Sequence, residues 1–421
     1  MPILYLTEDD VRGLLSMDVA LAAVGAAFRK WACEEAQNVP RQRCQTDNVM
    51  LHVLPAAAKT MNAIGLKAYT TGRFGAKFHV YLFDPKDGGL MAIIEADHLG
   101  AVRTGAATGV ATQLLARPDA TTAGLFGTGK QARTQLEAVC KVRAVRKAVV
   151  VGRDAARLKA FCDEMSGVCG TEVVPAGLPE EAGRQDIVVT ATSSREPVLF
   201  GRWLADGAHV NLIGSNFPSK AEADVDVFRR ATLVSVDSKE QARGEAGDFV
   251  PAIDAGVLHL ADVKELAPLL VGRYPGRQSP ADVTVFKSLG LGLEDVAVAA
   301  KVVELARQRG VGRILLGEPA AGGPPGGGGP AGAPPRGNAK PPPPPPPPLP
   351  PPPPPPPAAG STDHPAVATC WKRTRRLNIG FLPAGRVGSG LLRVYAPHFG
   401  HGRLSIACRS YSEKLPTRFQ R

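Results

Sequence analysis

Residues 121–236 repeat one pattern, in which apolar runs of strand length alternate with glycine turns and helical segments. "TTAGLF" leads into "GTGKQARTQLEAVC", and "KAVVV" leads into "GRDAARLKAFCDEM". The runs "DIVVTAT", "HVNLIG" and "ATLVSV" follow. Strands that alternate with helices form a parallel sheet with right-handed crossovers. The pattern predicts an α/β fold, with a Rossmann-type nucleotide-binding domain in residues 116–284.

The first glycine turn carries Gly127, Gly129 and Ala132 in a G-x-G-x-x-A arrangement. The first glycine allows a tight turn, the second lets the backbone approach a pyrophosphate, and the small third residue lets the helix pack on the strand. The helix N-terminus offers free N–H groups to the phosphates. An ordinary tight turn is the alternative, but the flanking strands and helix favour a dinucleotide. The predicted cofactor contacts are Gly127, Thr128, Gly129, Lys130 and Gln131.

The end of the second strand bears on the choice between NAD and NADP. An acid that binds the ribose 2′-OH of NAD is expected there, but the sequence has Gly152 followed by Arg153. A missing carboxylate removes repulsion against a 2′-phosphate, and a guanidinium can bind that phosphate. Arg153 therefore favours NADP(H). Asp154 keeps NAD(H) possible, unless it serves as the N-cap of the next helix.

Other segments predict elements outside this domain. Ser16 is a candidate N-cap for a helix over residues 17–32, whose apolar residues recur at helical spacing. "KFHVYLFD" and "LMAIIEA" predict strands around the turn "PKDGG". "GAVRTGAATGVATQLLA" predicts a buried helix rich in small residues. "LEDVAVAAKVVELARQRG" predicts a long helix that stops at Gly310.

The net charge of +11 does not indicate a nucleic-acid partner, because it belongs to the C-terminal part of the chain. The first 310 residues hold 36 basic and 36 acidic residues, whereas residues 361–421 hold 11 basic and 2 acidic ones. The chain contains no run of about 20 apolar residues, so we expect no membrane span. The seven cysteines form no CxxC pair, so we expect reduced thiols and no metal site. The N-terminus does not resemble a signal peptide, so we expect a cytoplasmic location.

Composition changes near residue 317. Pro341 to Pro357 is interrupted only by Leu349, and a proline run stays extended without forming a core. We expect residues 318–421 to be a disordered linker and basic tail. Such a segment could bind SH3-like or WW-like modules. A reading-frame or gene-structure artefact is the alternative that we favour.

Several segments of residues 1–317 together resemble one family. They are "VPRQR", "GLKAYT", "AVRTGAATGVAT", "GLFGTGKQA", "TATSSREPVL", "GSNFPSKAEAD" and "VFKSLGLGLEDVA", in this order. They resemble the ornithine cyclodeaminase/mu-crystallin family. The resemblance implies a split, mostly β substrate and dimerisation domain over residues 1–115, completed by a helix in residues 285–317, and a homodimer.

The resemblance also assigns site residues. Arg41 and Lys67 fall on positions that hold the substrate carboxylate, which suits a fork donor and a point charge. The cofactor-contacting positions are Arg103, Thr104 beside it, Thr192, Asn211, Lys220 and Ser288. No metal is implied.

Two residues depart from the cyclodeaminases of the family. Asn216 stands where their catalytic Asp would stand, and an amide cannot exchange a proton near neutral pH. His52 stands where they carry a Glu, either as a proton donor or as a packed side chain. Asn216 can still hydrogen-bond substrate or cofactor, and Lys67 and Asn216 are the candidate catalytic residues.

We therefore expect an NAD(P)-dependent oxidoreductase that transfers hydride to or from the α-carbon of a small imino or amino acid. Ketimine reductases and amino-acid dehydrogenases are the activities that fit. One alternative is an ornithine cyclodeaminase, which forms proline and ammonia. The other is a mu-crystallin-like protein that binds NADPH and a small ligand with little turnover.

Overall fold

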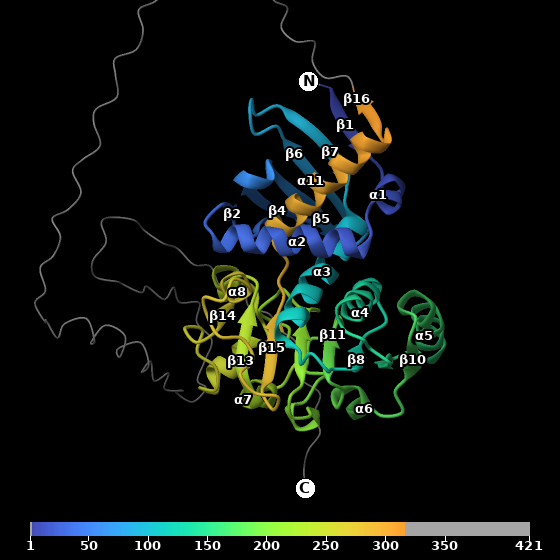
Figure 1. Cartoon of the computed structure of the whole chain (residues 1–421), viewed down its shortest axis with the longest axis vertical. Coiled ribbons are helices and arrows are strands. Elements are labelled where there is room, and N and C mark those ends of the chain that lie inside the picture. The colour runs from blue at the N-terminus through green and yellow to red at the C-terminus, as the bar shows by residue number, and fades with distance from the viewer. Residues whose placement is uncertain (1, 316–421) are drawn as a thin grey trace, which may run out of the picture. The chain divides into compact units, whose positions relative to one another are not determined.

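The computed structural model describes residues 2–315, so the expectations for residues 318–421 lie outside the described part. Two separate sheets organise the described chain (Figure 1). One sheet is mixed and the other is entirely parallel. The predicted α/β class, with a Rossmann-like parallel sheet and a mostly β domain, is confirmed.

The mixed sheet has the strand order β16-β1-β7-β6-β5-β4-β2, with β3 paired to β4. Only β1 and β7 pair in parallel. Its strands are β1 (Ile3–Leu6), β2 (Ala36–Asn38), β3 (Gln42–Gln45), β4 (Val49–Ala58), β5 (Ala63–Gly72), β6 (Gly75–Phe83), β7 (Leu90–Glu95) and β16 (Arg313–Leu315); the 3₁₀ helix η1 (Lys59–Met61) joins β4 to β5.

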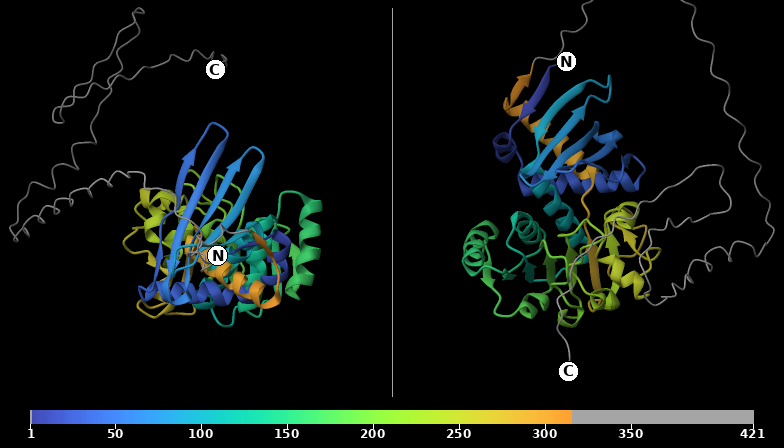
Figure 2. Two further views of the ribbon diagram at one scale, coloured as in Figure 1. Left: turned by 90° about the horizontal axis from the view of Figure 1, so that it is seen from above. Right: turned by 180° about the vertical axis from the view of Figure 1, so that it is seen from behind.

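Helices cover one face of the mixed sheet (Figures 1 and 2). They are α1 (Glu8–Leu14), α2 (Met17–Ala32) and α11 (Gly292–Arg309). The α1 helix begins with a capping box at Thr7, and Ser16 caps α2 as predicted. Ala56, Val80 and Leu82 point from the strands into the core that these helices close.

The parallel sheet has the order β10-β9-β8-β11-β12-β15-β13-β14. Its strands are β8 (Thr122–Phe126), β9 (Lys147–Val151), β10 (Glu172–Pro175), β11 (Ile187–Thr190), β12 (His209–Leu212), β13 (Ala231–Val236), β14 (Lys264–Glu265) and β15 (Val283–Lys287). Its helices are α4 (Lys130–Val142), α5 (Ala155–Cys169), α6 (Pro179–Gly183), α7 (Val225–Arg230), α8 (Lys239–Glu245), α9 (Phe249–Asp254) and α10 (Leu266–Leu270), with the 3₁₀ helix η2 (Gly201–Trp203). All five predicted strands of this region are present.

Helix α3 (Asp97–Leu115) runs from the mixed sheet toward the parallel sheet (Figures 1 and 2). Every residue from Leu99 to Thr112 is buried, as expected of a helix rich in small side chains. Gly105 lies against the Thr134 carbonyl of α4, so closely that a Cβ could not fit. The small residues therefore let α3 approach its neighbours closely and fix it between the two sheets.

The bounds 285–317 of the helix that completes the first domain need correction, although the predicted stop at Gly310 is confirmed. Residues 285–287 belong to β15 of the parallel sheet, and helix α11 begins only at Gly292. The segment after Gly310 forms β16, which pairs with β1. The chain returns to the mixed sheet after β15, because the loop 288–291 connects the two sheets.

Within residues 2–315, no single helix has the length and hydropathy of a membrane span, although the bent pair α1–α2 passes that test together. The same residues contain no group of three His, Cys, Asp or Glu side chains suited to a metal.

Candidate active site

A cavity of about 450 Å³ lies where the two sheets face each other. The mixed sheet contributes side chains of β4, β5 and β6, among them His52, Lys67 and Phe78. The parallel sheet contributes the loops that follow β11, β12 and β15. The carboxyl ends of parallel strands are where α/β folds bind ligands. A ligand in this cavity would touch both sheets.

Nine of the predicted site residues line this cavity: Arg41, Lys67, Arg103, Thr104, Lys130, Gln131, Thr192, Asn216 and Ser288. Six others do not: Gly127, Thr128, Gly129, Arg153, Asn211 and Lys220. Asn211 is buried in β12, where its amide donates to Thr112 Oγ1 at 3.1 Å. Lys220 lies with its ammonium group 5.5 Å from the centre of the Phe217 ring.

The glycine turn between β8 and α4 has the geometry that a pyrophosphate needs. Gly127 has φ +114°, and a Cβ there would lie 2.5 Å from the Ala191 carbonyl oxygen. Gly129 is the N-cap of α4, and no side chain caps the first N–H groups. A Cβ at Gly129 would meet nothing within 4 Å, so its surroundings are open. The turn therefore fits a dinucleotide, whose phosphates would occupy the free helix N-terminus.

Arg133, which the sequence did not indicate as a site residue, stabilises this turn by hydrogen bonds. Arg133 Nη1 donates to the carbonyls of Thr128 at 3.3 Å and Gly129 at 3.2 Å. Its other nitrogens pair with Glu164 of α5. Arg133 thus ties the turn to the helix that follows β9.

The end of β9 presents Arg153 to solvent, while Asp154 is engaged locally. Asp154 is the N-cap of α5 and accepts from the Arg157 N–H at 2.8 Å. Gly152 is closely packed, since a Cβ there would lie 2.9 Å from the Thr128 methyl group. A larger residue at this position would disturb the glycine turn.

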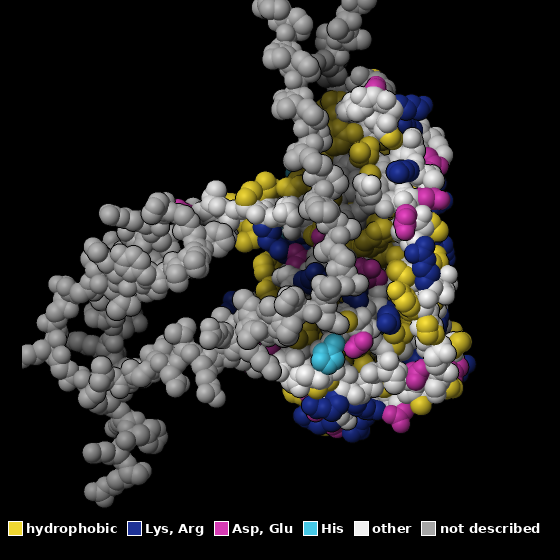
Figure 3. Space-filling view, turned by 90° about the vertical axis from the view of Figure 1, so that its left-hand side faces the viewer, with side chains coloured by type: hydrophobic (Ala, Val, Ile, Leu, Met, Phe, Trp, Pro, Cys, Tyr) yellow, Lys and Arg dark blue, Asp and Glu magenta, His cyan; other side chains and the backbone are white. Residues whose placement is uncertain are grey.

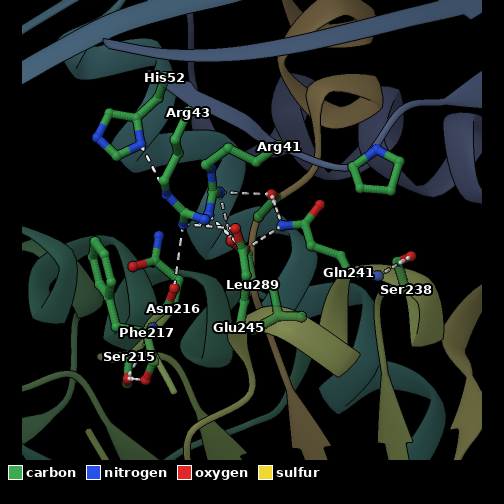
Figure 4. A network of polar contacts seen from close by, with 12 residues as sticks. Arg41, Arg43, His52, Ser215, Asn216, Phe217, Ser238, Gln241, Glu245 and Leu289 are labelled. Atoms are coloured by element: carbon green, nitrogen blue, oxygen red, sulfur yellow. Dashed lines mark hydrogen bonds and ion pairs between the residues drawn. The ribbon is translucent and has the colours of Figure 1, made fainter. Parts of the chain in front are cut away.

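Arg41 lies in a buried network that spans both sheets (Figure 4). Its Nη1 pairs with Glu245 Oε2 at 2.6 Å, and its Nη2 donates to the carbonyls of Leu289 and Gly290. Arg43 pairs with the second oxygen of Glu245 at 2.6 Å. Two guanidinium groups therefore share one carboxylate, which leaves excess positive charge at this end of the cavity.

A second buried network holds Lys67 and Arg103. Lys67 Nζ and Arg103 Nε both contact Asp295 Oδ1 at 2.9 Å, and Arg103 Nη1 pairs with Glu294 at 2.7 Å. Burial lowers the pKa of Lys67 to about 8, although Asp295 acts in the opposite direction. Burial also raises the pKa of Glu294 to about 7, against the attraction of Arg103.

Two buried carboxylates fix the loops beside the cavity. Glu222 accepts from the Thr192 N–H and hydroxyl, both at 2.7 Å, and from the Gly214 N–H at 2.6 Å. Asp237 accepts from the N–H groups of Leu289 at 2.6 Å and Gly290 at 2.9 Å. These bonds hold the loops after β11, β12 and β15 in place. Burial raises the pKa of both carboxyl groups.

The sequence did not indicate these partners individually, although most lie in the segments that carry the resemblance. Arg43 lies in "VPRQR", Glu222 in "GSNFPSKAEAD", and Glu294 with Asp295 in "VFKSLGLGLEDVA". Glu245 and Gln241 of α8 lie in none of them, and Gln241 Nε2 donates to Glu245 Oε2 at 2.8 Å. Nothing in the sequence marked α8 as part of the site.

The two departures from the cyclodeaminase pattern both line the cavity. Asn216 holds Arg43 through its backbone carbonyl at 3.4 Å (Figure 4). Burial and the neighbouring Arg43 and Arg41 lower the pKa of His52 to about 4, so the imidazole is neutral near pH 7. His52 is buried, at 1% exposure, and at neutral pH it carries no imidazolium proton to donate. Asp97 is the one carboxylate among the described lining residues, and Lys130 pairs with it.

On the face shown in Figure 3, basic and acidic side chains lie next to one another in small clusters. Hydrophobic side chains lie between one cluster and the next.

Residues 3–310 match the sequence model of the ornithine cyclodeaminase/mu-crystallin family. The chain is similar to alanine dehydrogenase of Archaeoglobus fulgidus, with 36% identity over 74% of this chain and 98% of that protein. A structure of Thermococcus litoralis Δ1-pyrroline-2-carboxylate reductase with NADH and L-proline has 34% identity and a TM-score of 0.70, over 74% of this chain and 99% of that one. A structure of an archaeal alanine dehydrogenase dimer with bound NAD has 34% identity and a TM-score of 0.71, over 75% of this chain and 99% of that chain.

Proposed function

Since the chain belongs to the ornithine cyclodeaminase/mu-crystallin family, we propose that it is a nicotinamide-dependent oxidoreductase of a small α-imino or α-amino acid. One observation carries this proposal. A single cavity joins the residues beside the dinucleotide turn, Lys130 and Gln131, to the buried cations Arg41 and Lys67. A reduced or oxidised nicotinamide and an α-carboxylate would therefore meet in one space. The similar proteins named above are imino-acid reductases and amino-acid dehydrogenases.

In this proposal, Lys67 and Arg41 bind the substrate carboxylate, and Arg103 holds Asp295 in place beneath Lys67. When bound, the nicotinamide supplies or accepts the hydride at its C4 atom. The rings of Tyr69 and Phe78 lie 5.8 and 5.2 Å from Lys67 Nζ and limit its access to water. With a pKa of about 8, Lys67 can also hold or release a proton at Nζ near neutral pH.

Ornithine cyclisation is the weaker candidate, because the carboxylate that serves as the base in the family's cyclodeaminases is absent, and Lys67 is assigned to the substrate carboxylate rather than to its amine. Asn216 supplies only an amide at the position of the family's Asp, and His52 is neutral. A missing general base commonly costs about 10²–10⁴ in rate.

A binding protein with little turnover would fit the same cavity, so a measurement of turnover is needed to separate it from an enzyme.

The dinucleotide itself is supported by the glycine turn, and the preference for NADP(H) over NAD(H) is a finer proposal. It rests on Gly152 and Arg153 in place of a ribose-binding acid. Asp154, the other nearby acid, already holds the Arg157 N–H.

A homodimer is the assembly that we propose, and the outer face of the mixed sheet is its candidate interface. Ile64 is 41% exposed on this face, and its register partner Phe83 is half-buried. Leu66 and Tyr81 pair in the same way two residues further along. Because strand side chains alternate, this row points away from the core residues Val80 and Leu82. One of the similar structures is itself a dimer.

The proposal is tested by steady-state oxidation of NADPH and NADH with Δ1-pyrroline-2-carboxylate and with mixtures of 2-oxo acids and ammonia. Stoichiometric conversion to the amino acid is expected. Cofactor binding without turnover of any substrate would favour the binding protein. Proline and ammonia from labelled ornithine, without net cofactor reduction, would favour the cyclodeaminase.

A further inference from the structure

Thr71 sits at the end of a hydrogen-bond relay that begins at Arg43. Arg43 Nε donates to His52 Nδ1 at 3.3 Å. The other ring nitrogen, His52 Nε2, lies 3.1 Å from Thr71 Oγ1. His52 and Thr71 both line the cavity. Arg43 lies between His52 and Glu245 (Figure 4).

This relay fixes which group carries each proton. A guanidinium is always a donor, so His52 Nδ1 must accept and the ring proton must be on Nε2. The Nε2–H group then donates to Thr71 Oγ1, which serves as the acceptor. The hydroxyl hydrogen of Thr71 has no acceptor among the described residues and remains available to a ligand.

Thr71 also has the right place along the cavity to meet a substrate side chain. Lys67, Tyr69 and Thr71 follow one another on the inner face of β5, because alternate residues of a strand share a face. Lys67 lies beside the Tyr69 ring, and Tyr69 stacks on His52 with ring centres 4.2 Å apart. One aromatic ring thus separates the carboxylate anchor from the His52–Thr71 pair.

The cofactor would approach from the opposite wall. Thr192, Gly214 and Ser288 belong to loops of the parallel sheet, whereas Thr71 belongs to the mixed sheet. A ligand held by its α-carboxylate at Lys67 would therefore extend its side chain toward Thr71 and away from the dinucleotide turn.

We propose that Thr71 is a specificity-determining residue that donates a hydrogen bond to an acceptor at the end of the substrate side chain. The preferred substrates are then α-imino acids with a second carboxylate or carbonyl oxygen, rather than those that end in an alkyl group. This assignment rests on the proposed function and narrows its substrate class.

Two open-chain imines test the assignment, because they differ only at the far end. Iminosuccinate, formed from oxaloacetate and ammonia, ends in a carboxylate, and iminopropionate, formed from pyruvate and ammonia, ends in a methyl group. The measured quantity is the ratio of their kcat/KM values with NADPH or NADH. Wild type should favour iminosuccinate roughly tenfold or more, as expected for a hydrogen bond to a charged group.

Thr71→Val removes the hydroxyl and should lower this ratio by roughly tenfold, mainly through KM for iminosuccinate. Thr71→Ser keeps the hydroxyl and should keep most of the ratio. A wild-type preference for iminopropionate would overturn the assignment even if the valine variant did not fold. An unchanged ratio in Thr71→Val, with both substrates slowed alike, would mean a structural role and overturn it as well. If the protein reduces neither open-chain imine and no cyclic imine, the proposed function is contradicted, and this assignment with it.

Discussion

Lys67 changes charge within the physiological pH range because it is buried. Its pKa of about 8 lies below the usual 10.5, so the ammonium form is lost as the pH rises through 8 rather than through 10.5. Asp295 keeps part of the charge on Lys67 by contact at 2.9 Å. A ligand carboxylate at Lys67 should therefore bind best below pH 8.

We predict that the affinity for pyruvate, a competitive ligand whose carboxylate does not titrate here, weakens above pH 8. Lys67→Met should weaken it at every pH by about 1.5–3 kcal/mol, the scale of a lost charge-assisted hydrogen bond. The arginine in Lys67→Arg stays charged from pH 6 to 10, so the inhibition constant of pyruvate for this variant should show no inflection near pH 8. Inhibition constants from pH 6 to 10 provide the measurement, and an inflection that persists in Lys67→Arg would assign it to another group.

Arg153 allows an equally local prediction about the cofactor. Arg153→Ala should weaken NADPH binding by about 1.5–3 kcal/mol and barely affect NADH, because only NADPH carries the 2′-phosphate. Fluorescence titration of both cofactors measures this difference. A wild-type protein that binds NADH ten times more tightly would contradict the proposed NADP(H) preference.

At the scale of elements, the sequence predicted strands and helices better than the contacts between them. The apolar runs of β8, β9 and β12 were recognisable because glycine turns bound them. Asp295 could not be recognised as the partner of Lys67, since 228 positions separate them and only the return of α11 to the mixed sheet joins them. The same holds for Glu245 and Arg41, which are 204 positions apart.

The turn before α4 yields a prediction with a matched control. Gly127→Ala should destabilise the fold by about 1–3 kcal/mol, because φ is +114° and the new Cβ would meet the Ala191 carbonyl. Gly129→Ala should leave the thermal transition nearly unchanged, since its Cβ would meet nothing within 4 Å, yet weaken cofactor binding. Melting curves and cofactor titrations of both variants measure the two effects. Full cofactor affinity in Gly129→Ala would argue against a pyrophosphate at this turn.

For the whole molecule, every residue of the candidate site lies within residues 2–315, in strands, helices and loops that meet between the two sheets. Lys67 comes from the mixed sheet, Arg41 from the segment between β2 and β3, and Arg103 from α3, whereas the dinucleotide turn follows β8 of the parallel sheet. Neither half forms the cavity alone, which explains why the sequence indicated the separate parts but not the cavity.

Residues 318–421 are therefore predicted to be dispensable. A chain that ends at Gly317 should keep the thermal transition and cofactor affinity of the full chain, because its charges balance up to residue 310 and its core is closed by α11. Calorimetry and cofactor titration compare the two chains. Insoluble protein after truncation would mean that the removed part contributes to the fold.

Hydride transfer between a nicotinamide and the α-carbon of an imino acid is the reaction that we propose for this protein. The most direct measurement uses NADPH and NADH that carry deuterium at both C4 positions, together with Δ1-pyrroline-2-carboxylate and iminosuccinate. We predict one deuterium at the α-carbon of the product amino acid for each reduced cofactor consumed. Tight cofactor binding with no deuterium in any amino acid would contradict the claim.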